Sequence, residues 1–444
     1  MTRPLSIPLA RVLHATLVLL TLCSHSWAQS SLQVPIQFDF LDPGAKSLSL
    51  GSAFVGLADD ATAAQANPAG LVQLTRPEIS FEGRFHRLEQ PFLSGGRLSG
   101  TPTGIGVDVL PGPVFVDLES TSFSPAFLSL VYPIKRVTIA AYRHEPMRLD
   151  QTFTADGTFQ FRPPLQEDRD TAFDGSRSIH VTNYGASAGL RLTPGLSVGA
   201  GVSVYRFDLD FDFHRYGFQN SQLYAPPDPT AVLFRITQSG DSTGVAANVG
   251  VLAAAGPHIN MGATFKRGPR LAFTSTSTLV GGTPQSVSAK FRVPDVLAVG
   301  TAIRPSDSIL FTVQYNRVFD SQLRHDYIDV LVNLPGSRER ADRFSIDDSN
   351  EFHLGAEYVF AGLKTTPAVR GGFWSDPDHS VRYDATPNYD FFDERISIAL
   401  GSGRTLWHYT FGAGSSVSSH FEWSFGGDLS DRTRMLSFSI IGRF

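Results

Sequence analysis

A serine between two glycines is the pattern in this sequence that could support covalent catalysis. The segment GASAG at residues 185–189 has the spacing of the nucleophile turn of hydrolases, in which the serine lies on a strained turn between a strand and a helix. Here Thr182 and Tyr184 alternate with Asn183 just before the motif, which predicts a strand that continues through it. We therefore expect Ser187 to be an ordinary strand residue. We predict no catalytic residue and no enzymatic activity.

Side chains that bind metals are scattered along the chain. There are 12 histidines without an H-E-x-x-H pattern, and the one cysteine is Cys23, so neither a thiolate metal site nor a disulfide is expected. Two carboxylate pairs, Asp59-Asp60 and Asp347-Asp348, could hold a cation, but solvated carboxylates of a loop or of the hatch are the favoured interpretation. We predict no metal and no cofactor.

Residues 1–28 have the layout of a secretory signal peptide. Arg3 and Arg11 precede a largely apolar run at 12–23, and Ser26-Trp27-Ala28 supplies the small residues of a cleavage site. The apolar run is about 12 residues long, whereas a spanning helix needs roughly 20. A lipid anchor on Cys23 is disfavoured because the preceding residue is Leu22. We therefore expect an exported protein from which this leader is removed.

The composition excludes several classes of protein. With 42% hydrophobic residues the chain is not disordered, and its net charge of -5 argues against a nucleic-acid partner. No run of 18 apolar residues follows Gln29, so we expect no membrane-spanning helix. The basic residues are mostly arginine, which would serve either anionic lipid headgroups or carboxylates in a lumen. The protein is then either soluble or a membrane barrel.

Alternation of apolar and small or polar residues recurs from Pro77 to the last residue. Ile309, Phe311 and Val313, for example, alternate with Leu310 and Thr312. Tight connections are expected at 133–136, 193–196, 255–258, 304–308, 361–365 and 415–419. Long polar connections are expected at 145–177, 215–229, 277–285, 319–349 and 375–405. Short turns that alternate with long loops are typical of outer-membrane barrels.

The alternating runs predict fourteen strands. They lie near 79–85, 127–132, 137–144, 179–192, 197–213, 232–254, 259–276, 286–303, 309–318, 352–358, 368–374, 406–412, 420–426 and 435–444. An even number of strands places both ends of the barrel on one side of the membrane. The fold class is therefore all-β, a transmembrane antiparallel β-barrel in the bacterial outer membrane.

The last strand ends in an aromatic residue. Leu436, Phe438, Ile440 and the terminal Phe444 share one face, which resembles the insertion signal of outer-membrane barrels. We expect this strand to be recognised by the barrel-assembly machinery. Outer-membrane lipids are the other expected surroundings, and the barrel is expected to be a monomer.

Residues 29–76 interrupt the alternation, because an apolar cluster with Phe38 and Phe40 precedes a stretch rich in Ala, Ser and Gly. About 48 residues cannot form an independent core of any size. We therefore divide the chain into a signal peptide (1–28), a hatch that plugs the lumen (29–76) and the barrel (77–444).

The strand near 197–213 changes its apolar parity. Val198 to Val204 are apolar at even positions, whereas Phe207 and Phe211 lie at odd positions. Either a β-bulge near Tyr205-Arg206 reverses the faces, or the strand rises above the membrane and turns its phenylalanines inward as a hydrophobic entry groove.

Several motifs together resemble the FadL-type outer-membrane transporters of long-chain fatty acids and other hydrophobic compounds. The motifs, in chain order, are Ala58-Asp59-Asp60-Ala61, Asn67-Pro68-Ala69-Gly70-Leu71, Val293-Pro294-Asp295-Val296, Arg304-Pro305-Ser306-Asp307 with Tyr315, and Val369-Arg370-Gly371-Gly372-Phe373 with Asp376-Pro377. With the terminal Phe444, they span most of the exported chain.

This resemblance implies a hatch-gated transporter that takes up hydrophobic small molecules. Substrate would be caught among external loops, pass to a lumen pocket against the hatch and leave sideways at an inward kink of the wall. The resemblance assigns gating to Asn67, Pro68, Ala69, Asp59 and Asp60. Together with the apolar cluster it places Phe38 and Phe40 near the pocket, and the odd-position stripe adds Phe207 and Phe211.

Two other functions stay open. The hatch motif is also similar to that of PorV-type barrels, which shuttle protein cargo in secretion, and a purely structural outer-membrane role is a further alternative. An apolar tunnel ending at Asn67-Pro68-Ala69 would favour transport. A polar, sealed lumen with a large apolar patch on the outer loops would favour cargo binding.

Overall fold

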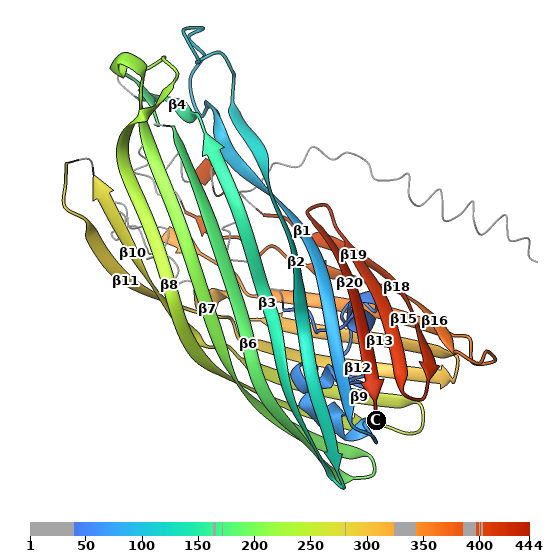
Figure 1. The fold of residues 1–444 in the computed structure, drawn as a ribbon. Coiled ribbons are helices and arrows are strands. Elements are labelled where there is room, and N and C mark those ends of the chain that lie inside the picture. Colours follow the sequence, from blue (N-terminus) through green and yellow to red (C-terminus); the bar gives the residue numbers. More distant parts are fainter. Residues whose placement is uncertain are drawn as a thin grey trace, which may run out of the picture.

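Antiparallel strands close on themselves into a tall, slanted barrel, with short helices inside its lower part (Figure 1). The structure is a computed structural model that describes residues 40–162, 166–170, 172–279, 281–323, 343–384, 397–398, 400 and 403–444. The predicted signal peptide and Phe38 lie outside the described residues.

Fourteen strands of the described chain form the ring. They are β1 (Glu78–Arg97), β2 (Pro113–Ile134), β3 (Val137–Ala155), β6 (Phe173–Thr193), β7 (Leu196–Phe218), β8 (Pro227–Ala254), β9 (Ile259–Arg267), β12 (Val296–Ser306), β13 (Ile309–Val318), β15 (Ser349–Val359), β16 (Pro367–Asp376), β18 (Leu406–Ser418), β19 (Phe421–Leu429) and β20 (Thr433–Arg443). Each pairs with the next, and β20 closes the ring on β1 with Arg443 opposite Glu78. The predicted strand number and the barrel fold are confirmed.

The strands of one side run well past the predicted boundaries. The segment 145–177, expected as a loop, continues β3, forms β4 (Gly157–Arg162) and β5 (Gln166–Arg169), and starts β6. Its alternation is polar on one face, yet the backbone still pairs above the apolar part of the barrel. The expectation of a loop was therefore wrong, because apolar alternation marks only the part of a strand that faces lipid.

Two predicted strands are each broken in two. The run 259–276 splits into β9 and β10 (Arg270–Leu279), and the run 286–303 splits into β11 (Gln285–Arg292) and β12. Pro269 and Pro294 lie at the two breaks and have no N–H to donate to a ladder. Asp295 Oδ1 instead accepts the backbone N–H of Gly268 at 2.9 Å.

The remaining elements are short. They are α2 (Ala45–Ser49), α3 (Ala63–Ala66), the 3-10 helices η1 (Pro68–Gln73), η2 (Gln219–Ser221) and η3 (Asp320–Leu323), and the two-stranded pair β14 (Phe344–Ser345) with β17 (Arg382–Tyr383). No helix in the described chain has the length and apolar character needed to cross a membrane.

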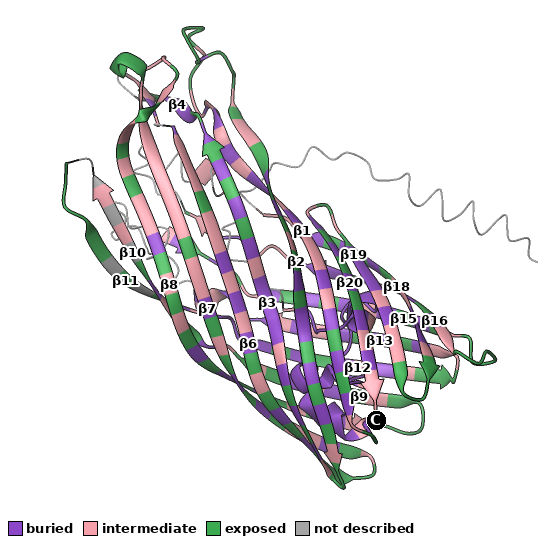
Figure 2. Cartoon of the chain, in the orientation of Figure 1, coloured by how far each residue is buried: buried purple, intermediate pink, exposed green. Residues whose placement is uncertain are grey.

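All six predicted tight connections are confirmed: each joins two neighbouring ring strands. Burial alternates along the strands, as the green and purple bands of Figure 2 show. On β7, Val202 and Val204 are exposed on the outside while Ser197 and Ser203 are buried inside. An apolar outer face and a small or polar inner face are thus built from one alternating sequence.

Candidate functional site

The segment of residues 40–74, called the plug segment below, lies against the inner wall in the lower barrel (Figure 1). Asn67 fastens it there. Its Nδ2 donates to the carbonyls of Val55 (3.0 Å) and of Val251 on β8 (3.2 Å), and its Oδ1 accepts the N–H of Ala69 at the start of η1. Pro68 occupies the first turn of η1, where no N–H is needed. Asn67, Pro68 and Ala69 therefore act together as one joint between plug segment and wall.

The wall around the plug segment is built from glycine. A Cβ atom added to Gly199 would lie 2.4 Å from Ala69 N, and one added to Gly250 would lie 2.1 Å from Asn67 Oδ1. Other wall glycines that meet the plug segment in this way are Gly189, Gly262, Gly355, Gly372, Gly412 and Gly426. The close approach of two backbones explains these eight of the chain's 40 glycines, and the sequence alone did not reveal it.

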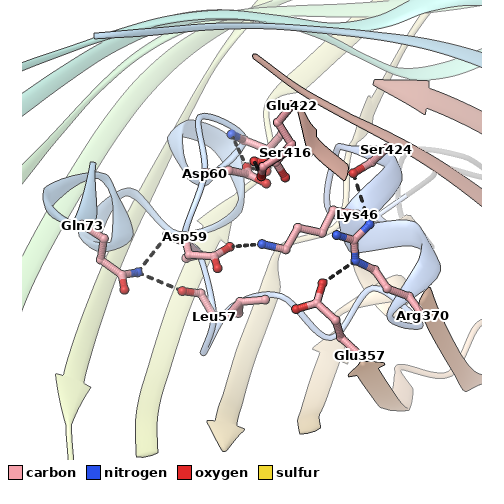
Figure 3. Close-up of polar contacts among 12 residues, drawn as sticks. Lys46, Leu57, Asp59, Asp60, Gln73, Glu357, Arg370, Ser416, Glu422 and Ser424 are labelled. Carbon is pink, nitrogen blue, oxygen red and sulfur yellow. Dashed lines mark hydrogen bonds and ion pairs between the residues drawn. The ribbon is translucent and has the colours of Figure 1, made fainter. Parts of the chain in front are cut away.

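Asp59 and Asp60 have different partners (Figure 3). Asp59 accepts Lys46 Nζ at 2.8 Å and Arg304 Nη2 of β12, also at 2.8 Å. Asp60 accepts the backbone N–H (2.8 Å) and the hydroxyl (2.5 Å) of Thr62, just before α3. Asp59 thus ties the plug segment to the wall, and Asp60 orders its α3 turn.

The other carboxylate pair lies at the upper rim. Asp348 accepts Arg317 Nη2 at 2.8 Å, and Asp347 pairs with Arg382. Ion pairs of Asp59, Asp347 and Asp348, and the hydrogen bonds from Thr62 to Asp60, therefore account for both carboxylate pairs that the sequence offered as cation ligands.

Ser187 lies in the middle of β6, as predicted, and its hydroxyl points inward. Its Oγ donates to the carbonyl of Ala64 in the plug segment at 2.6 Å. In the same GASAG segment Gly189 leaves room for Pro68. The motif therefore forms part of the contact between wall and plug segment.

An apolar cluster fills the lumen above the plug segment; we call it the lumen cluster. Its least exposed members lie on neighbouring strands of the wall, from β6 and β7 to β10 and β11, and Phe40 packs against it. Its buried members are Leu88, Met147, Leu149, Ile179, Val181, Phe207, Leu271, Phe273, Phe291, Val293, Leu323, Phe344, Ile346 and Val381. Two of the predicted pocket residues, Phe40 and Phe207, thus meet at one place.

The parity change on β7 arises without a bulge. Register with β6 is continuous from Val198 to Arg215, so the odd positions face the lumen along the whole strand. Below Tyr205 the inward positions are Ser or Gly, and above it they are Phe207, Leu209, Phe211 and Phe213. Of the two alternatives, the bulge is wrong and the inward stripe is what the structure contains.

Phe211 belongs to a second apolar group nearer the mouth, the phenylalanine cluster, formed by Phe92, Phe153, Phe173, Phe211 and Phe213. Their ring centroids lie 5.2 to 6.5 Å apart, which is the spacing of interacting aromatic pairs. Phe211 and Phe207 therefore line different levels of the same inner wall.

A polar belt on β1, β3 and β6 lies between these two clusters, whereas on β7 Leu209 connects the level of Phe207 with that of Phe211. Arg177 Nε donates to Gln151 Oε1 at 2.8 Å, and Arg177 Nη2 donates to Gln90 Oε1 at 3.2 Å. The guanidinium of Arg177 therefore donates hydrogen bonds to two amide side chains, and this group lies between the phenylalanine cluster and the lumen cluster.

The wall has a window between β2 and β3. Their ladder ends at Phe127–His144, because Glu145 and Pro146 form a bulge on β3. Above this point β2 and β3 no longer pair with each other, although β2 still pairs with β1 and β3 still pairs with β6. Above the window, Asp150 N–H on β3 donates to Ser120 Oγ on β2 at 3.3 Å, and Asp156 N–H donates to Ser94 O of β1 at 2.7 Å. In the sequence, a Glu-Pro pair directly after a predicted strand marks this bulge, and we did not predict a window from it.

The window is closed to a ligand in this structure. The cavity between its edges, lined by Leu88, Ala126, Pro146 and Met147 among others, has a volume of about 50 Å³, far below the 300 Å³ or so of a small-molecule pocket. Arg143 Nη1 donates to the free carbonyl of Pro125 across its lower corner. Arg143 also pairs with Glu145 at 2.7 Å.

No model of a known protein family matches the sequence, and no curated protein does. Solved structures do match. A FadL homologue of Pseudomonas aeruginosa has 14% identity and a TM-score of 0.61, covering 94% of this chain and 100% of its own. The toluene transporter TbuX of Ralstonia pickettii has 16% identity and a TM-score of 0.58, covering 91% and 99%.

The monoaromatic hydrocarbon channel CymD matches equally well, with 15% identity and a TM-score of 0.58 over 92% of this chain and 99% of its own. At such identities the likeness is one of fold. The chain therefore has the barrel fold of the FadL-type transport proteins.

Proposed function

We propose that this protein is an outer-membrane transporter for hydrophobic small molecules. The observation that carries the proposal is the inward apolar surface that begins at the phenylalanine cluster and continues, below the polar belt, in the lumen cluster. Side chains of this kind give an apolar solute a favourable path out of water. The similar barrels named for toluene and monoaromatic hydrocarbons agree with this substrate class.

The plug segment is proposed to prevent straight passage to the far side of the membrane. Asn67 is fully buried, and it bonds both to the plug segment and to β8. A molecule that reaches the lumen cluster would then leave through the window between β2 and β3. This route requires the window to widen, since its cavity holds only about 50 Å³.

A protein shuttle of the PorV type is the second candidate, and one observation favours it. The loop between β1 and β2 exposes Ile105, Val109 and Leu110, each by half or more of its surface. An exposed apolar loop can bind a protein partner. The lumen, however, contains the phenylalanine cluster and the lumen cluster among its polar and small side chains, which favours the transporter.

Uptake of N-phenyl-1-naphthylamine, a neutral apolar dye, tests the proposal. Cells that produce the barrel should take up the dye about tenfold faster than cells without it, which corresponds to about 1.4 kcal/mol in the barrier. Equal rates at confirmed surface expression would contradict transport of this substrate class. A triple variant, Ile105→Ser, Val109→Ser and Leu110→Ser, separates the two candidates, because it should leave dye uptake intact but abolish cargo binding.

A further inference from the structure

A groove lies on the outer, lipid-facing side of the wall across β2, β3, β6 and β7. Its volume is about 590 Å³. Alanines form its floor, and Leu130, Ile139 and Val202, all strongly exposed, rise at its sides. The floor residues are Ala141, Ala186, Ala188 and Ala200.

Strand register explains why the outer face is hollow here. Ala141 lies opposite Ala186, and Ala188 lies opposite Ala200, so two cross-strand pairs of methyl groups are adjacent. On β6 and β7 the next outward pair is Ala186 with Val202, and the one above it, Tyr184 with Val204, is large and exposed on both strands. The groove therefore has a closed upper end on β6 and β7.

The plug segment holds the floor of the groove from inside. Ser187 Oγ donates to Ala64 O at 2.6 Å, and Ser129 Oγ on β2 donates to Ala61 O at 3.2 Å. Both serines face the lumen between outward residues of the groove. Because the wall is fastened from behind, the floor keeps its shape when the outer side is filled or empty.

The groove begins where the window ends. The pair Leu130–Ala141 on its edge lies three rungs below Phe127–His144, the last rung of the β2–β3 ladder. Strands β2 and β3 therefore border the window and, directly below it, one side of the groove. A molecule that leaves sideways through the window meets this groove as the nearest hollow of the outer wall.

We propose that the groove is the receiving site for the transported apolar molecule after it has passed the window, an inference that rests on the proposed function. A volume of 590 Å³ falls in the range of small-molecule pockets. Since lipid chains are as apolar as the groove, the molecule gains packing contacts rather than hydrophobic free energy. Retention is consequently weak, as release into the membrane requires.

Filling the groove tests the proposal. The double variant Ala188→Leu with Ala200→Leu keeps the outer face apolar, and Ala356→Leu, on the outward face of β15, is the matched control. We expect uptake of N-phenyl-1-naphthylamine to fall about fivefold in the groove variant alone. Binding of the dye to the purified barrel should stay unchanged in both.

The outcomes separate this proposal from the proposed function. If the groove variant transports as fast as Ala356→Leu while the unmodified protein transports well, the receiving site is refuted and the transporter stands. If the unmodified protein takes up no dye, the proposed function fails and the groove's role with it.

A second copy of the chain is the competing occupant, because small residues allow close approach of two surfaces in lipid. The only cysteine of the sequence is Cys23, in the predicted leader, so Ala188→Cys gives a single reporter. Efficient oxidative cross-linking of two such barrels in membranes would assign the groove to a dimer and overturn the proposal. A monomer under the same conditions supports it.

Discussion

The lower and upper halves of the lumen contain different kinds of residue. Below, plug segment and wall meet through glycines, alanines and side chains that bond to backbone, as at Asn67 and Ser187. Above, the clusters consist of phenylalanines and aliphatic side chains of neighbouring strands. Under the proposed function, the lower half would act as a seal that depends on close fit, and the upper half as a surface on which an apolar molecule can move.

The seal should be most sensitive to added volume. Gly250→Val places its Cβ where Asn67 Oδ1 lies at 2.1 Å, and an overpacked contact of this kind costs about 3 kcal/mol. We expect the plug segment to be displaced, so that cells become sensitive to vancomycin, a bulky hydrophilic antibiotic. Gly362→Val is the control, because a Cβ there meets nothing within 4 Å. Equal resistance of the two variants would break the contrast between seal and path.

Loss of the Asn67 side chain should weaken the same seal by less. Asn67→Ala leaves the carbonyls of Val55 and Val251 without this donor, at about 2 kcal/mol for buried groups. We expect faster proteolysis of the plug segment from the periplasmic side, with heat-dependent migration of the barrel unchanged. Gln73→Ala is the comparison, because the amide of Gln73 donates to the carbonyls of Leu57 and Ala58, which both belong to the plug segment itself.

If the Asn67→Ala variant, combined with Pro68→Ala, takes up dye at the unmodified rate with equal surface expression, these residues have no part in gating. They would then be structural alone.

The upper half should respond to polarity rather than to volume. Phe211→Ser removes an aromatic ring from the phenylalanine cluster, where each ring pair contributes about 1 kcal/mol beyond its area. We expect about fivefold slower dye uptake and an unchanged seal, measured by vancomycin resistance. Phe360→Ser is the control, since Phe360 is exposed at the end of the barrel where the tight turns lie. A loss of resistance in Phe211→Ser would show that the two halves are not independent.

The two halves also differ in how far sequence could predict them. Alternation of outward residues such as Ile309 and Phe311 predicted the ring, because the lipid face imposes a period of two. The inward stripe on β7 could be drawn only as one of two alternatives, since parity alone does not distinguish a bulge from a change of lining. Register with β6 decided it.

The seal was the least predictable part. The Asn-Pro-Ala motif marked the plug segment by resemblance, but its partners are glycines on strands far along the chain, such as Gly250. A glycine in a strand indicates close approach without naming what approaches. The window was missed for a related reason: Glu145-Pro146 looks like the start of a loop until β6 is seen to pair on both sides of it.

At the mouth of the barrel, an ion pair stabilises the loop between β1 and β2. Removing it is expected to have a smaller effect than the changes above. Asp108, buried in the loop between β1 and β2, accepts Arg97 Nε at 3.1 Å and the backbone N–H of Thr103 at 2.8 Å. Burial alone would raise the pKa of this carboxyl, but the hydrogen bonds from Arg97 and Thr103 outweigh it and lower the pKa below its ordinary value of about 3.9.

A carboxyl with a lowered pKa stabilises the loop at any pH above that ordinary value, and the stabilisation is lost only as the pH falls through the lowered pKa. Amide hydrogen exchange of residues 103–110, corrected for intrinsic rates, should therefore be equally slow at pH 7 and pH 5. Asp108→Asn should speed it at pH 7 by about threefold. Dye uptake and vancomycin resistance should not change, because the loop touches neither seal nor path. Faster exchange between pH 7 and pH 5 in the unmodified protein would mean that another group holds the loop.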